Sequence, residues 1–134
     1  MMNSTKFPHL LNAQLLEDLP DNKKTDFLDG CSVRFFVEPT EFLSQSEPAS
    51  GMFMVAHGSV EVSYLSEDGH RSIIYHTGPG EVLGLTEAIA ERNCAASCRA
   101  FANTTVLFCA KPLIFEQLKS PVFIRNHAAD LHER

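Results

Sequence analysis

The chain contains neither a long apolar run nor a targeting segment. Its longest uninterrupted apolar stretches, such as 52–56 and 106–110, are five residues long, whereas a membrane-spanning helix needs about 20. The first residues have no apolar segment of the kind found in secretory signals. These absences predict a cytoplasmic protein with no membrane partner.

Positive charge is also scarce. The 11 Lys and Arg residues are outnumbered by 17 Asp and Glu residues, giving a formal net charge of −6 at pH 7. No five-residue window is dominated by basic residues. Because nucleic-acid affinity comes largely from neutralising phosphates with Lys and Arg, we do not expect this chain alone to bind DNA.

Motifs for metal binding and covalent catalysis are missing as well. The sequence contains no Cys-x-x-Cys, no His-x-His and no Gly-x-Ser-x-Gly, which argues against a zinc framework, a metal-dependent cupin and a hydrolase nucleophile. Cys31 and Cys109 are typical of small buried strand residues. Cys94 and Cys98 would share one face of a helix or strand, but two thiols lack a third zinc ligand. We therefore predict a protein that is not an enzyme and has no metal site.

What is present suits one globular domain over residues 1–134, with 44% hydrophobic and 21% charged residues. We predict N-terminal helices within 7–29, a β region over 31–110 and C-terminal helices within 113–134. One amphipathic helix is expected over 7–19, and a second begins at an Asp21 cap and ends before Gly30. The last helix is expected to start at Pro121.

The predicted strands are short and separated by turn residues. The stretch 59–65 alternates, with Val60, Val62 and Tyr64 expected on one face, as in a half-buried strand. A turn is expected at 77–80, followed by an irregular stretch up to the strand that begins at 97. About seven or eight strands with flanking helices favour a closed or double-sheet antiparallel architecture. The predicted strands cover 31–37, 41–43, 51–56, 59–65, 71–76, 97–102 and 104–110.

Three segments together resemble the cyclic-nucleotide-binding domain of the catabolite-activator/FNR regulator family. They are 51–62, 78–85 and 98–101, and the resemblance extends over about 7–134. It implies a mainly β fold with flanking helices, a double-stranded β-helix jelly roll (β-roll), in which the last helix pairs two subunits. Longer members continue into a DNA-binding helix-turn-helix. The chain is thus expected to be a stand-alone sensor or the sensor part of a longer regulator.

The resemblance also specifies where a cyclic nucleotide would bind. In binders, a Gly-Glu pair opens a short helix that cradles the phosphate and ribose, and an Arg-Ser/Thr-Ala segment pairs with the phosphate. At these positions the chain has Gly84-Leu85 and Cys94-Ala95-Ala96. Both polar anchors are replaced, so cyclic AMP is not expected to bind in the usual way.

Candidate ligand-binding residues follow from the same alignment. Arg92 is a possible substitute for the missing arginine, or a solvated side chain beside Glu91. Thr86 and Glu87 either face the pocket or support a helix start, and the side chain of Arg99 can face outward. No cofactor is assigned; the candidate effector is a cyclic nucleotide or another small anion. The full set of candidates is Gly84, Leu85, Thr86, Glu87, Arg92, Cys94, Ala95 and Arg99.

The last segment carries an apolar stripe at Ile124, Ala128 and Leu131, a spacing typical of a helix–helix seam. The resemblance implies a homodimer through this helix; alternatively, the helix docks on its own β-roll. We therefore predict a non-catalytic regulatory domain in which an effector shifts the packing of the last helix. The alternative is a ligand-free β-roll that serves protein interaction or dimerisation.

Overall fold

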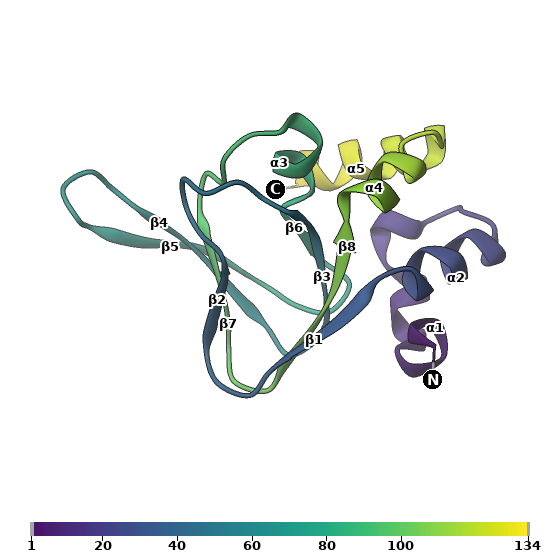
Figure 1. Ribbon diagram of the computed structural model, residues 1–134, viewed down its shortest axis with the longest axis horizontal. Helices are drawn as coiled ribbons and strands as arrows, with labels where there is room; N and C mark the ends of the chain where they lie inside the picture. The colour runs from purple at the N-terminus through teal and green to yellow at the C-terminus, as the bar shows by residue number, and fades with distance from the viewer. Residues whose placement is uncertain (1, 134) are drawn as a thin grey trace.

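The computed structural model describes residues 2–133, in which eight strands form two four-stranded sheets and the helices gather at one side (Figure 1). The strands are β1 (Ser32–Phe36), β2 (Thr40–Leu43), β3 (Gly51–His57), β4 (Val60–Leu65), β5 (Arg71–Thr77), β6 (Val82–Leu83), β7 (Ser97–Ala100) and β8 (Thr104–Ala110). The helices are α1 (Asn3–Lys6), the 3-10 turns η1 (Pro8–Asn12) and η2 (Gln14–Leu16), α2 (Asp21–Asp29), α3 (Leu85–Ala90), α4 (Lys111–Gln117) and α5 (Pro121–Glu133).

The strand order is that of a jelly roll. One sheet runs β1-β8-β3-β6 and the other β2-β7-β4-β5, and the paired strands are antiparallel. Apart from the β4–β5 hairpin, which stays in one sheet, each strand lies in the other sheet from the strand before it, and this closes the two sheets into a roll. The predicted β-roll with flanking helices is confirmed.

The predicted helix over 7–19 is wrong. That segment consists of the turns η1 and η2, separated by Ala13, whose backbone is extended with ψ 142°. Pro8 is the first residue of η1, and only Phe7 separates it from the end of α1. The leucines of the segment are mostly buried, but they reach the helical core from two short turns and not from one straight helix face.

The predicted cap of the next helix is also wrong. Asp21 is the first helical residue of α2; Pro20 occupies the cap position and makes no side-chain cap bond. Gly30 is the C-cap residue, as predicted. The carboxylate of Asp21 therefore lies in the first turn, where it complements the helix dipole.

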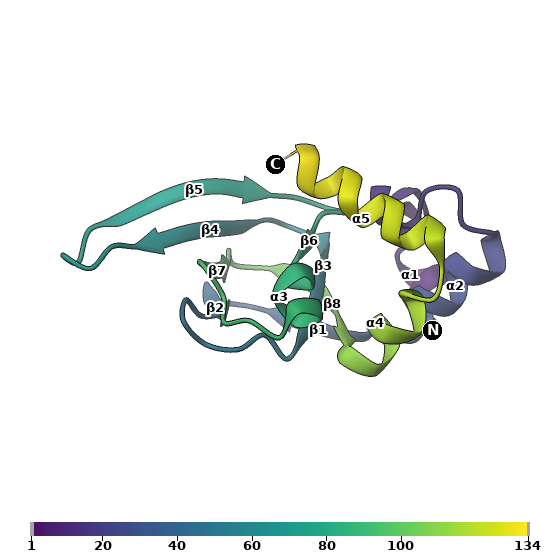
Figure 2. The same cartoon turned by 90° about the horizontal axis from the view of Figure 1, so that it is seen from above.

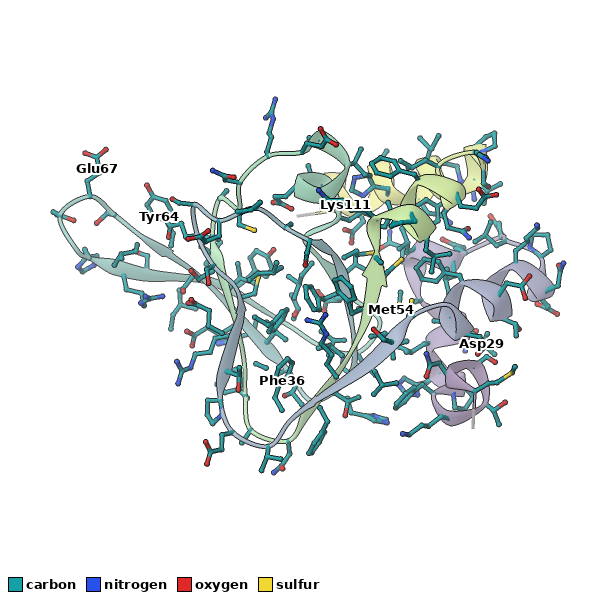
Figure 3. The ribbon with its side chains drawn as sticks, viewed as in Figure 1. Asp29, Phe36, Met54, Tyr64, Glu67 and Lys111 are labelled. Atoms are coloured by element: carbon teal, nitrogen blue, oxygen red, sulfur yellow. The ribbon has the colours of Figure 1, made fainter. Side chains whose placement is uncertain are left out.

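The predicted alternation along β4 holds only as far as Val62. The pairing with β5 shifts there: Val62 lies opposite Tyr75, but the next residue, Ser63, lies opposite Ile73, so Ile74 has no partner residue in the register. Ser63 is buried and accepts a 2.8 Å hydrogen bond from Nη1 of Arg71. Tyr64 is 44% exposed, since the end of the β4–β5 hairpin projects away from the body (Figures 2 and 3).

β3 has apolar residues on both faces because it separates two cores. Met52 and Met54 face a cluster shared with the helices, and Phe53 and Val55 face a cluster between the two sheets. Figure 3 shows Met54 between the sheet and the helical side. The helical core fixes the helices against one sheet, and the inner core holds the roll closed.

The turn between β3 and β4 requires glycine. Gly58 has φ +88°, and an added Cβ would lie 2.5 Å from Oγ1 and 2.9 Å from Cα of Thr104. We expect Gly58→Ala to lower the free energy of unfolding by about 2–3 kcal/mol, from backbone strain plus this clash. The control is Gly69→Ala, at φ +84° with none of the described atoms within 4 Å, which should cost about 1 kcal/mol from strain alone. Equal losses for the two variants in urea unfolding would contradict the steric argument.

Candidate functional site

A pocket of about 270 Å³ lies between the β-roll, α3 and α5. Strands β4, β5 and β6 contribute mostly apolar side chains, and the two helices contribute the polar ones. The lining residues are Leu43, Val62, Ile74, Tyr75, Val82, Leu83, Gly84, Leu85, Thr86, Glu87, Cys94, Ala95, Ala96, Cys98, His127 and Asp130.

Gly84 brings α3 close to the roll. It is the N-cap of α3 with φ +81°, and an added Cβ would lie 3.1 Å from the carbonyl oxygen of Gly51 and 3.1 Å from Cδ1 of Leu43. A larger residue would push α3 away from β3 and open the pocket. The following Leu85 is buried in the helical core, so it borders the pocket without offering a polar group.

Backbone hydrogen bonds hold Cys94 at the pocket. Its N–H donates to the carbonyl oxygen of Glu47 at 2.7 Å, and its carbonyl oxygen accepts from the N–H of Ser46 at 2.8 Å. Burial raises the pKa of the Cys94 thiol, and the negative charge of Glu87 raises it further. The thiol is therefore protonated at neutral pH, and the charge of Glu87 acts on the inside of the pocket.

The structure brings most of the predicted site residues together. Gly84, Leu85, Thr86, Glu87, Cys94 and Ala95 line the pocket, whereas Arg92 and Arg99 are not among its lining residues.

Both arginines are exposed. Arg99 lies on β7 opposite Glu41 and Glu61 in the two neighbouring strands, while the adjacent Cys98 and Ala100 are buried. Its side chain therefore faces outward, between the oppositely charged Glu41 and Glu61. Arg92 follows α3, and its backbone N–H donates to the carbonyl oxygen of Glu87 at 3.0 Å.

The other pocket-lining residues were not predicted from the sequence, among them Ile74 and Tyr75 on β5 and His127 and Asp130 on α5. Nothing in their local spacing marks them, because chain topology brings these elements to α3. A contact between the two helices spans the pocket, since Nε2 of His127 lies 3.5 Å from Oγ1 of Thr86. The polar groups of the site thus come from two helices.

One face of α5 docks on the body. Phe123 is fully buried, with its ring centroid 6.0 Å from that of Phe27. Nδ2 of Asn126 donates to the carbonyl oxygens of Leu15 at 2.9 Å and Glu17 at 2.7 Å. These contacts hold the helix at the mouth of the pocket.

The opposite face of α5 carries part of the predicted seam. Ile124 is 49% exposed and Ala128 is exposed. Leu131 belongs to α5, but its side chain lies outside those described. The helix therefore packs on the N-terminal helical segment of its own chain and also exposes Ile124 and Ala128 to solvent.

Across the part of the chain that the structure describes, no group of three or more His, Cys, Asp or Glu residues is placed to hold a metal ion. The four cysteines are free and buried. Among residues 2–133, no helix is long and apolar enough to cross a membrane.

Solved structures show where this fold occurs elsewhere. The catabolite activator protein of Thermus thermophilus superposes with a TM-score of 0.83 at 22% identity, over 91% of this chain and 58% of that protein. The sensor domain of the transcriptional regulator DNR from Pseudomonas aeruginosa gives 0.81 at 17% identity, over 98% and 89%. The regulatory subunit of a cAMP-independent protein kinase A from Trypanosoma cruzi, bound to guanosine, gives 0.72 at 18% identity, over 90% and 47%.

Sequence comparison identifies the family. No curated protein matches the chain, but the family model for the cyclic nucleotide-binding domain matches residues 33–120, which include the strands of the roll and the site-bearing α3. Because the match covers more than half of the sequence, the chain belongs to the cyclic nucleotide-binding domain family.

Proposed function

We propose that the chain is a non-catalytic, effector-sensing regulatory domain of the cytoplasm, in which a small molecule binds between the β-roll and α5. The observation that carries this proposal is that α3 and α5 line one pocket, through Thr86 and Glu87 on one side and His127 and Asp130 on the other. A ligand there touches both helices, so its affinity depends on the position of α5. Binding therefore shifts the population of α5 arrangements. The presence of the pocket favours this function over a ligand-free β-roll.

The effector is not held as cyclic AMP usually is. Leu85 and Cys94 stand where the family's ribose glutamate and phosphate arginine are expected. No Lys or Arg is among the described pocket-lining residues, so a bound phosphate would lose water without gaining a cationic partner. The Trypanosoma cruzi subunit is bound to guanosine, which has no phosphate. This supports the idea that the fold can hold a ligand without a phosphate group.

Isothermal titration calorimetry with cyclic AMP and cyclic GMP tests this proposal. We expect no saturable binding of either nucleotide below about 1 mM, equivalent to less than about 4 kcal/mol of binding free energy. A Kd in the low micromolar range would show that other contacts replace the two anchors, and would contradict the proposal.

We propose further that two copies pair through the exposed strip of α5. A chain that dimerises through Ile124 and Ala128 should be dimeric at high micromolar concentration in light scattering. Ile124→Glu should weaken the dimer at least about tenfold, since it places a charge at the centre of an apolar seam. The control is Phe115→Glu, at a 43% exposed position on α4. A monomeric wild-type chain, or equal effects of the two variants, would contradict pairing through α5.

A further inference from the structure

The pocket has the size and walls of a site for a small ring compound. Its volume of about 270 Å³ lies just below the range of about 300–1,000 Å³ that is typical of drug-sized ligands. Leu43, Val62 and Tyr75 form apolar walls, and Ile74 at the edge is 54% exposed. A flat apolar ligand would cover this surface and remove it from water.

The charges of the pocket are negative. Glu87 on α3 and Asp130 on α5 line it, and His127 is the one lining residue in the described part of the chain that can become a cation. The charge of Glu87 contributes to the raised pKa of the Cys94 thiol, so its field extends into the cavity. The nearby basic residues, Arg92 and Arg99, are exposed and do not line it.

We infer that the pocket selects a small planar organic cation, such as an amidinium or a protonated amino-heterocycle, and rejects anions of the same shape. This inference rests on the proposed function and names the ligand class of the same site. The ring lies against the apolar walls, and its N–H groups donate to the carboxylates of Glu87 and Asp130. Carboxylates attract a cation more strongly in a half-enclosed pocket than in water, and repel an anion for the same reason.

A shape-matched charge series tests the inference on the full chain. Benzamidine, benzamide and benzoate have nearly the same size and carry charges of +1, 0 and −1. In NMR titrations at pH 8, where imidazoles are mostly uncharged, benzamidine should shift the amide signals of 84–87 and 94–96. Its Kd should be at least about tenfold lower than that of benzoate. Equal binding of the two ions, tighter binding of benzoate, or no binding of any probe would overturn the inference.

Two variants locate the source of the preference. Glu87→Gln removes one pocket charge and should reduce the preference for benzamidine about fivefold or more. Glu67→Gln removes the same charge from the tip of the projecting hairpin (Figure 3) and should leave the preference unchanged. Equal effects of the two variants would mean that net charge alone sets the preference, and would overturn the assignment to this pocket.

Light scattering of the same samples separates this inference from the proposed function. Selective benzamidine binding with no change in the dimer population would contradict coupling to α5 while leaving the ligand class intact. If benzamidine and benzoate bind equally and cyclic AMP still does not bind, the inferred ligand class is wrong, but the proposed function stands.

Discussion

Replacing Asn126 with aspartate is expected to lower the free energy of unfolding by about 1–3 kcal/mol at pH 7, the usual cost of leaving buried polar groups unsatisfied. Nη2 of Arg125 donates to Oδ1 of Asn126 at 3.3 Å, and its positive charge offsets part of the cost of the new carboxylate. Asn126 is 3% exposed, and its Nδ2 donates to the carbonyl oxygens of Leu15 and Glu17. In the variant, a carboxylate oxygen would face these two carbonyl oxygens instead. Because native stability is typically about 5–15 kcal/mol, a loss of this size would weaken the docking of α5 on the body measurably.

The loss should depend on pH in a definite direction. Burial opposite two carbonyl oxygens raises the pKa of the introduced carboxyl in the folded state above its unfolded value of about 3.9. The Arg125 guanidinium opposes this shift only in part, because it also pairs with Asp18 at 2.9 Å. Below about pH 4 the group is protonated in both states and can donate one hydrogen bond, so the difference from wild type is small. As the pH rises above 4, the unfolded state ionises first and the difference grows.

Urea unfolding of Asn126→Asp at pH 4.5 and pH 7.5, each relative to wild type, checks this expectation. The matched control is Ala129→Asp, which adds the same charge at an exposed position on α5 and should cost less than about 1 kcal/mol. If the two variants lose similar stability at both pH values, the hydrogen bonds of Asn126 do not anchor α5.

Strands could be predicted from the sequence where an apolar run is bounded by turn residues. β8 forms at its predicted bounds, 104–110, and β3 at 51–57 was predicted to within one residue, because both are apolar runs between turn residues. The helix predicted over 7–19 was wrong for the opposite reason. Its leucines have helical spacing, but the extended Ala13 divides the segment into two turns, the first of which begins at Pro8. Packing against the neighbouring helices in the helical core stabilises these turns.

Only the part of the site formed by neighbouring stretches of the sequence could be predicted. Gly84 to Glu87 and Cys94 to Ala95 were identified because the resemblance places them in one cassette, and all of them line the pocket. The other polar lining residues lie on more distant elements: Tyr75 on β5, and His127 and Asp130 on α5. Asp130 is 46 residues after Gly84, and only tertiary packing brings these residues to α3. Because Asp130, one of the two carboxylates that line the pocket, is on α5, the negative charge of the pocket could not be predicted from the sequence.

Installing the missing phosphate anchor is expected to create an affinity for cyclic AMP. Cys94 is at the position of the family's arginine and lines the pocket, but a guanidinium there would meet the carboxylate of Glu87, whose charge already acts on the thiol. The variant should therefore combine Cys94→Arg with Glu87→Ala, so that the arginine pairs with the ligand. A charge-assisted hydrogen bond contributes about 1.5–3 kcal/mol, which corresponds to about a 10- to 100-fold lower Kd than in wild type.

Calorimetry with cyclic AMP on this double variant measures the gain. The matched control combines Cys94→Gln with Glu87→Ala, which supplies similar reach and hydrogen bonding without the positive charge. If the control gains as much affinity as the arginine variant, the space left by Glu87 governs binding, and the missing charge does not. If the arginine variant alone binds cyclic AMP, the pocket keeps the geometry of a nucleotide site, and the residue at 94 determines which sign of charge it admits.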